Sequence, residues 1–170
     1  MVNSLRFSIV GDVQPPCRAH EHDAGIDFFV PNDFVETYIY PNEGIKIPTG
    51  VKINIPEGTA LMAFNKSGVA TKHGLIKGAE LADCGYQGEL HIHVINTSNS
   101  LVKISPGMKI IQFVLVPVLT PALEQVPENE LFEAKSARGE GGFGSTGTTA
   151  KEVVKPNEIG TVEDVLGLAQ

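Results

Sequence analysis

The sequence predicts an all-β protein in the class of sandwiches, barrels and jelly rolls, and two observations support this. Apolar and polar residues alternate with period two, most clearly in Val51–Ile55 and Leu90–Val94, which places apolar side chains on one face of a strand. Turn-forming residues punctuate the chain, as in Pro56-Glu57-Gly58. Hydrophobic residues make up 42% of the 170 residues, which is enough for the core of one domain.

Most of the predicted elements are strands, each rich in β-branched or aromatic residues and bounded by Gly, Pro or Asn. In chain order they are Leu5–Val10, Val35–Tyr40, Gly44–Ile47, Val51–Ile55, Ala60–Phe64, Leu90–Val94, Leu101–Ile104 and Lys109–Val118. Between the fifth and the sixth of them, Gly68–His73 is expected to form one short turn of helix.

The strand pattern fades after Pro121 and divides the chain into three parts. Residues 1–120 are predicted to form the folded core, and residues 121–147 an arm that ends in a glycine-rich motif. The tail, residues 148–170, is expected to be disordered or to form a short helix docked on an unknown partner.

Charge and composition limit the partners that this protein can have. A formal net charge of −7 argues against a nucleic-acid partner, although a single nucleotide needs only local positive charge. No stretch is long and apolar enough for a signal peptide or a membrane span, and Cys17 and Cys84 read as free thiols of a reducing compartment. We therefore expect a cytoplasmic protein without a membrane partner, with a nuclear or virus-encoded origin left open.

The glycine-rich motif carries the strongest chemical signal. Five glycines fall between Gly139 and Gly147, so the backbone can approach a ligand closely. Its other residues suit a nucleotide, because a guanidinium and two hydroxyls bind phosphate and an isolated ring can cover a base. These residues are Arg138, Phe143, Gly144, Ser145 and Thr146. A flexible linker is the alternative, whereas a dinucleotide-binding fingerprint lacks its strand and helix.

Two interior segments add to this interpretation. Lys66, Ser67 and Gly68 follow an apolar strand and combine a cation, a hydroxyl and a glycine, which suits phosphate oxygens. Asp83 and Tyr86 lie in a glycine-containing connection, where a carboxylate could take a proton from water and a ring could stack on a sugar. Taken alone, each segment is more readily interpreted as a surface turn.

Five segments in order resemble the motifs of the trimeric dUTPase family. The family patterns A-G-x-D-L, R-S-G-L-A-x-K-H, G-V-I-D-x-x-Y-x-G and G-x-R-I-A-Q-L correspond to residues 24–28, 66–73, 80–88 and 107–113. The fifth pattern, R-G-x-G-G-F-G-S-T-G, is matched at every position from Arg138 to Gly147. The resemblance spans residues 20–147 and is specific because all five motifs occur in order.

The resemblance implies a jelly-roll homotrimer with shared active sites that hydrolyses dUTP to dUMP and pyrophosphate, supplying dUMP and keeping uracil out of DNA. Asp83 would be the general base, Tyr86 would pack on the deoxyribose, and Asp27 would support the site. The resemblance also implies that the backbone of residues 78–88, including Gly78 and Leu81, would recognise uracil. The phosphates would be bound by Lys66, Ser67, Gly68 and Gln112. The arm would close over the nucleotide through Arg138, Phe143, Gly144, Ser145 and Thr146. One Mg²⁺ would be held by the substrate phosphates and water, without direct protein ligands.

The chain departs from the family pattern at a few positions. Lys66 and Lys109 stand where the family has arginine, and Glu80 replaces a glycine. A dCTP deaminase-like enzyme is one alternative, but His93 stands ten residues after Asp83, where that reaction needs a carboxylate. A binding or regulatory protein that uses the dUTPase fold is the other alternative. His91 and His93 are interpreted as a polar strand face, or one that lines a subunit contact, rather than as a metal site.

Overall fold

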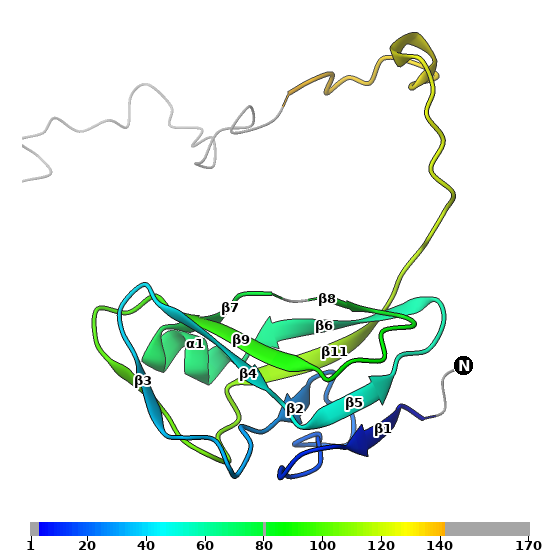
Figure 1. Ribbon diagram of the computed structural model, residues 1–170. Coiled ribbons are helices and arrows are strands. Elements are labelled where there is room, and N and C mark those ends of the chain that lie inside the picture. Colours follow the sequence, from blue (N-terminus) through cyan, green and yellow to red (C-terminus); the bar gives the residue numbers. More distant parts are fainter. Residues whose placement is uncertain (1–3, 80, 142–170) are drawn as a thin grey trace, which may run out of the picture. The chain divides into compact units, whose positions relative to one another are not determined.

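A computed structural model describes residues 4–79 and 81–141 (Figure 1). The chain divides into two compact units, Met1–Ala122 and Leu123–Gln170. The predictions for Glu80, for Phe143, Gly144, Ser145 and Thr146, and for the tail 148–170 lie outside the described residues.

Antiparallel strands build the first unit, which confirms the all-β prediction. Its largest sheet has the order β2-β11-β6-β8, formed by Ile26–Phe28, Ile111–Pro117, Thr59–Asn65 and Leu81–Asp83. A second sheet has the order β4-β9-β7, formed by Gly44–Pro48, His91–Asn96 and Leu75–Lys77. Two pairs complete the described sheets, β1 (Arg6–Ile9) with β5 (Val51–Asn54) and β3 (Thr37–Ile39) with β10 (Val102–Ile104).

Each strand and the helix turn expected from the sequence occur in the structure, with ends that shift by one or two residues. Helix α1 spans Ser67–His73 and ends at Gly74, whose left-handed backbone (φ 65°) lets its N–H close the last turn. Three strands were not predicted, namely β2, β7 and β8. Each has only three residues, and unlike the equally short β3 and β10 none lies within a longer run of strand-forming residues that the sequence analysis singled out. β2 is also buried throughout, so it shows no alternation.

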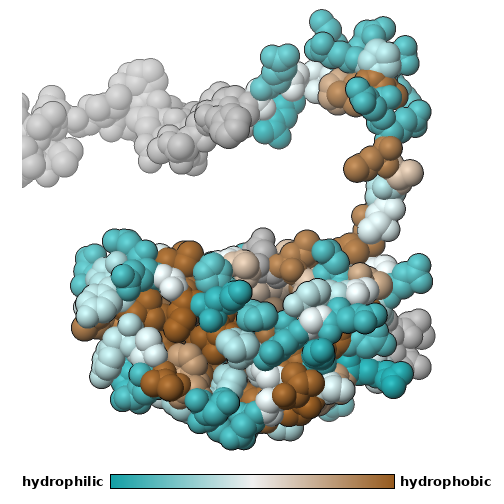
Figure 2. All heavy atoms as spheres, viewed as in Figure 1, coloured by the Kyte–Doolittle hydropathy of each residue, from teal (hydrophilic) through white to brown (hydrophobic). Residues whose placement is uncertain are grey.

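Alternation places the core between the sheets. In β9 the buried residues Ile92 and Val94 alternate with half-buried His91 and His93. The rings of Phe28 and Phe113 meet edge to face with their centroids 4.7 Å apart, joining β2 to β11. Apolar patches nevertheless interrupt the polar surface of this unit on the face shown in Figure 2. No helix within the described ranges is long and apolar enough to cross a membrane.

The described part of the second unit contains little regular structure. One turn of 3-10 helix, η1, spans Glu128–Glu130. A further turn surrounds Arg138, whose Nε donates to the carbonyl of Gly141 at 2.7 Å, and the Gly139 N–H donates to Ser136 Oγ.

Candidate active site

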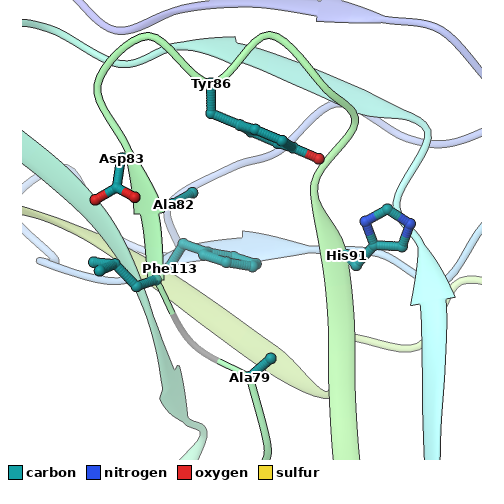
Figure 3. A pocket seen from close by; sticks show the side chains of 7 residues that line it. Ala79, Ala82, Asp83, Tyr86, His91 and Phe113 are labelled. Carbon is teal, nitrogen blue, oxygen red and sulfur yellow. The ribbon is translucent and has the colours of Figure 1, made fainter.

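One pocket lies beside strand β8 and the turn that follows it (Figure 3). We call it the hairpin pocket, and its lining residues are Ala79, Leu81, Ala82, Asp83, Tyr86, His91 and Phe113. In Figure 3 the Tyr86 ring lies above the Phe113 ring, and the Ala82 methyl faces the side occupied by His91. The pocket thus has two flat aromatic walls and a polar rim.

Asp83 stands at that rim, at the end of β8. Its side chain is exposed, and its carboxylate turns away from the Ala82 methyl, as expected for neighbours on a strand (Figure 3). Its backbone carbonyl accepts from the Tyr86 N–H at 3.2 Å, which closes the turn. The residues described make no hydrogen bond or ion pair with the carboxylate, so its oxygens are accessible for accepting hydrogen bonds from water.

Tyr86 is held in place from two directions. Its hydroxyl donates to the backbone carbonyl of Glu89 at 2.9 Å. Gly88 lies against the ring, and a Cβ at that position would come within 2.2 Å of the Tyr86 hydroxyl oxygen. A side chain at position 88 would therefore displace the ring from the pocket wall.

A second pocket, which we call the lysine pocket, gathers Ala19, Asp23, Ala24, Gly25, Asp27, Lys66 and Gln112. Asp27 is 3% exposed and forms ion pairs with Lys66 and with Lys109, whose Nζ is 3.0 Å from Asp27 Oδ2. Burial alone raises the pKa of Asp27, but hydrogen bonds and charge from the two lysines outweigh it, so this pKa lies below its ordinary value. The same pairing raises the pKa of Lys109.

The residues predicted to bind phosphate lie at the lysine pocket or directly beside it in the chain. Lys66 is the extended residue that precedes α1, so Ser67 and Gly68 form the first turn of the helix, where both are exposed. A Cβ on Gly68 would meet no atom within 4 Å. Gln112 donates from Nε2 to the Asn65 carbonyl at 2.9 Å, which ties β11 to the segment before α1.

The structure does not bring the two pockets together within one chain. In the β2-β11-β6-β8 sheet, Asp83 pairs with Ala60, whereas Gln112 pairs with Phe64 and Asp27. Their partners on β6, Ala60 and Phe64, are four residues apart, and β8 and β11 lie on opposite sides of β6. With standard strand dimensions, the Cα atoms of Asp83 and Gln112 are therefore roughly 16 Å apart. The predicted residues therefore form two clusters at opposite ends of β6, with Arg138 in the second unit.

The sequence interpretation missed two residues of the hairpin pocket, His91 and Phe113. Ala79 also lines this pocket and lies within the 78–88 backbone that was predicted to read uracil. The H-x-H spacing at 91–93 did indicate two imidazoles on one strand face, which was the available signal. In the described ranges no group of three or more His, Cys, Asp or Glu side chains is placed to hold a metal ion.

Comparison with known proteins places this geometry in a family. The dUTPase family model matches residues 12–147. The deoxyuridine 5'-triphosphate nucleotidohydrolase of Clostridium novyi is 41% identical over 134 residues, which cover 78% of this chain and 89% of that protein.

Solved structures agree. A mutant dUTPase of Staphylococcus bacteriophage 80alpha with dUpNHpp has a TM-score of 0.74 and 32% identity, covering 86% of this chain and 99% of the phage chain. A mutant dUTPase of Staphylococcus aureus phage phi11, which coordinates a structural Mg(II) ion, has a TM-score of 0.67 and 29% identity, covering 78% and 100% of the two chains. The chain belongs to the dUTPase family, which confirms the predicted jelly-roll fold and enzyme class.

Proposed function

We propose that the protein hydrolyses dUTP to dUMP and pyrophosphate, with Asp83 orienting and deprotonating the attacking water. The observation that carries this proposal is the exposed Asp83 carboxylate at the rim of a pocket with aromatic walls. Membership of the dUTPase family supports the substrate.

The hairpin pocket takes the deoxyuridine. Backbone groups of residues 78–88, including those of Gly78 and Leu81, read the uracil edge. The Tyr86 ring, fixed by Glu89 and Gly88, packs on the deoxyribose. Because the ring cannot move back, a 2′-hydroxyl has no room, and UTP is rejected.

The chemical step is an in-line displacement at the α-phosphorus. Asp83 accepts a proton from the water while the water oxygen forms a bond to phosphorus. The bond from the α-phosphorus to the oxygen bridging it to the β-phosphorus breaks, and its electron pair leaves with pyrophosphate. Positioning matters more than basicity here, since the water must stand opposite the leaving oxygen.

The lysine pocket and the first turn of α1 take the phosphates. Lys66, Ser67, Gly68 and Gln112 supply a cation, a hydroxyl, an accessible backbone and an amide. Asp27 supports them by holding Lys66 in place, and its oxygens already accept from two lysines. Because Asp27 is occupied in this way, Mg²⁺ would be held by the substrate phosphates and water rather than by protein ligands, and it would neutralise part of the phosphate charge.

The two clusters serve one nucleotide only if two copies of the chain meet. Side chains stand roughly perpendicular to a sheet, so Asp83 and Gln112 do not lean toward each other across roughly 16 Å. Half-buried Met62 and Val114 occupy the same face between them, and an apolar surface does not suit a triphosphate. We therefore place Asp83 of one copy beside the lysine pocket of another, within the homotrimer that the family resemblance implies.

The arm completes the site. Arg138, Phe143, Gly144, Ser145 and Thr146 close over the triphosphate and the base and exclude water. Ordering these residues costs conformational entropy, which contacts with the correct nucleotide offset.

A nucleotide panel tests the proposal. Purified protein with Mg²⁺ is given dUTP, UTP, dCTP or dTTP, and pyrophosphate and the nucleoside monophosphate are quantified. We expect pyrophosphate to be released from dUTP at least about 100-fold faster than from the other three nucleotides. Ammonia release from dCTP would support the deaminase alternative instead, and inactivity towards all four would leave the binding or regulatory alternative.

A further inference from the structure

The imidazole of His93 makes a contact that the proposed reaction does not use. His93 lies in β9 between β4 and β7, and its backbone carbonyl accepts from the Gly78 N–H at 2.8 Å. The next amide of the chain, that of Ala79, donates to Nδ1 of the His93 ring at 2.7 Å. The side chain thus continues the hydrogen-bond ladder at the point where the chain leaves β7 for the hairpin pocket.

A second contact locks the same ring. A Cβ on Gly78 would lie 2.2 Å from His93 Nδ1 and 2.4 Å from Cε1, so the ring packs directly on the Gly78 backbone. Gly78 does not have a positive φ, and the requirement for glycine is therefore one of space. Because Nδ1 accepts a hydrogen bond, the neutral ring carries its proton on Nε2.

We propose that His93 is a positioning residue for base recognition: its Nδ1 anchors the Ala79 amide and so fixes the wall of the hairpin pocket that reads the pyrimidine. This inference rests on the proposed function for its substrate. Ala79 lines the pocket directly, and Gly78 and Leu81 are the residues predicted to read uracil. Without the anchor the wall relaxes, which weakens binding of the correct base more than it slows chemistry at Asp83.

Matched substitutions at one position test the anchor. In His93→Asn the Oδ1 atom replaces Nδ1 at the same distance from the backbone, whereas His93→Gln places its polar atoms one bond farther out. His93→Leu keeps apolar bulk and removes the acceptor. We expect His93→Leu and His93→Gln to raise KM for dUTP about tenfold, with kcat changed less than about threefold, and His93→Asn to stay within about threefold of the parent KM.

Hydrogen exchange gives a readout that does not depend on activity. Mass spectrometry of a peptide covering residues 75–82 should show that one amide, assigned to Ala79, exchanges about tenfold faster in the Leu and Gln variants than in the parent. In the Asn variant this amide should stay as protected as in the parent. Equal amide exchange in the parent protein and in the Asn and Gln variants would overturn the proposal that His93 anchors the Ala79 amide. The proposal would also fail if the Asn and Gln variants had the same KM for dUTP. If exchange follows the series but the parent protein hydrolyses no dUTP, the anchor stands and the proposed function fails.

Discussion

At the scale of single residues, two carboxylates of this chain have opposite environments. Asp83 is exposed and has no described ionic partner, whereas Asp27 is buried between two lysines. A carboxylate that must accept a proton from water needs accessible oxygens, and one that holds cations needs its oxygens occupied. The structure therefore separates a catalytic candidate from a supporting one.

Replacing Asp83 tests its role as general base. Asp83→Asn keeps the size of the side chain and removes the proton acceptor, so we expect kcat for dUTP to fall about 1000-fold. Binding of the non-hydrolysable analogue dUpNHpp, measured by calorimetry, should change less than about threefold. Asp33→Asn, which alters an exposed carboxylate outside both pockets, is the control. Near-normal turnover in Asp83→Asn would remove this residue from the mechanism.

Asp27 gives a prediction about pH. Its folded pKa lies below its ordinary value of 3.8, so its stabilisation is complete well above pH 4 and is lost as pH falls from there through the folded pKa. Urea unfolding from pH 3 to pH 7 should show a steeper acid loss for the parent than for Asp27→Asn. At pH 7 we expect the variant to be less stable by about 2 kcal/mol, since Lys109 is partly exposed to water. Parallel curves for the two proteins would contradict the ion-pair account, and Glu57→Gln is the exposed control.

At the scale of elements, every described strand of four or more residues could be predicted, whereas three of the five three-residue strands could not. β5 and β9 alternate cleanly because one face of each is buried. β7 and β8 have three residues each, and their pairing with β9 and β6 depends on contacts far away in sequence. The ion pairs of Asp27 with its two lysines could not be predicted for the same reason, because the partners are far apart in sequence; Lys66, for example, lies 39 residues from Asp27.

The motifs conveyed residue types but not their mutual distances. Asp83, Tyr86 and Leu81 share a pocket because a turn joins them locally. Lys66 and Gln112 share a pocket because β6 and β11 are neighbours in the sheet. That these two groups lie at opposite ends of β6 follows from strand register, which the sequence does not display.

The arm is the element whose role truncation can test. Removing residues 138–170 deletes Arg138 and the glycine-rich motif, so kcat/KM for dUTP should fall at least about 100-fold. Removing residues 148–170 keeps the motif, and activity should stay within about twofold of the parent. Sedimentation should find the same assembly in both truncated proteins. Full activity without residues 138–170 would show that closure by the arm is dispensable.

At the scale of the whole molecule, the separation of the two pockets predicts complementation between inactive variants. Asp83→Asn spoils the hairpin pocket and leaves the lysine pocket intact, whereas Gln112→Ala does the opposite. If each site combines one pocket from each of two copies, random mixing restores about a quarter of the parent activity. The two variants are unfolded and refolded together, and dUTP turnover is compared with that of each refolded alone.

A mixture no more active than its components would mean that one chain supplies the whole site. A second mixture, of Asp83→Asn with Tyr86→Ala, is the matched control, because both changes fall in the same pocket and should not complement each other.

The spacing of the hairpin pocket and the lysine pocket along β6 has a consequence for how the protein works at low abundance. If each active site needs a hairpin pocket and a lysine pocket from two copies, as proposed, a solitary copy carries one of each but has no counterpart within reach of either. Turnover per chain should therefore fall on dilution below the concentration at which copies associate. A copy damaged in one pocket that still associates would silence the one site to which that pocket belongs, although the other copy in that site is intact.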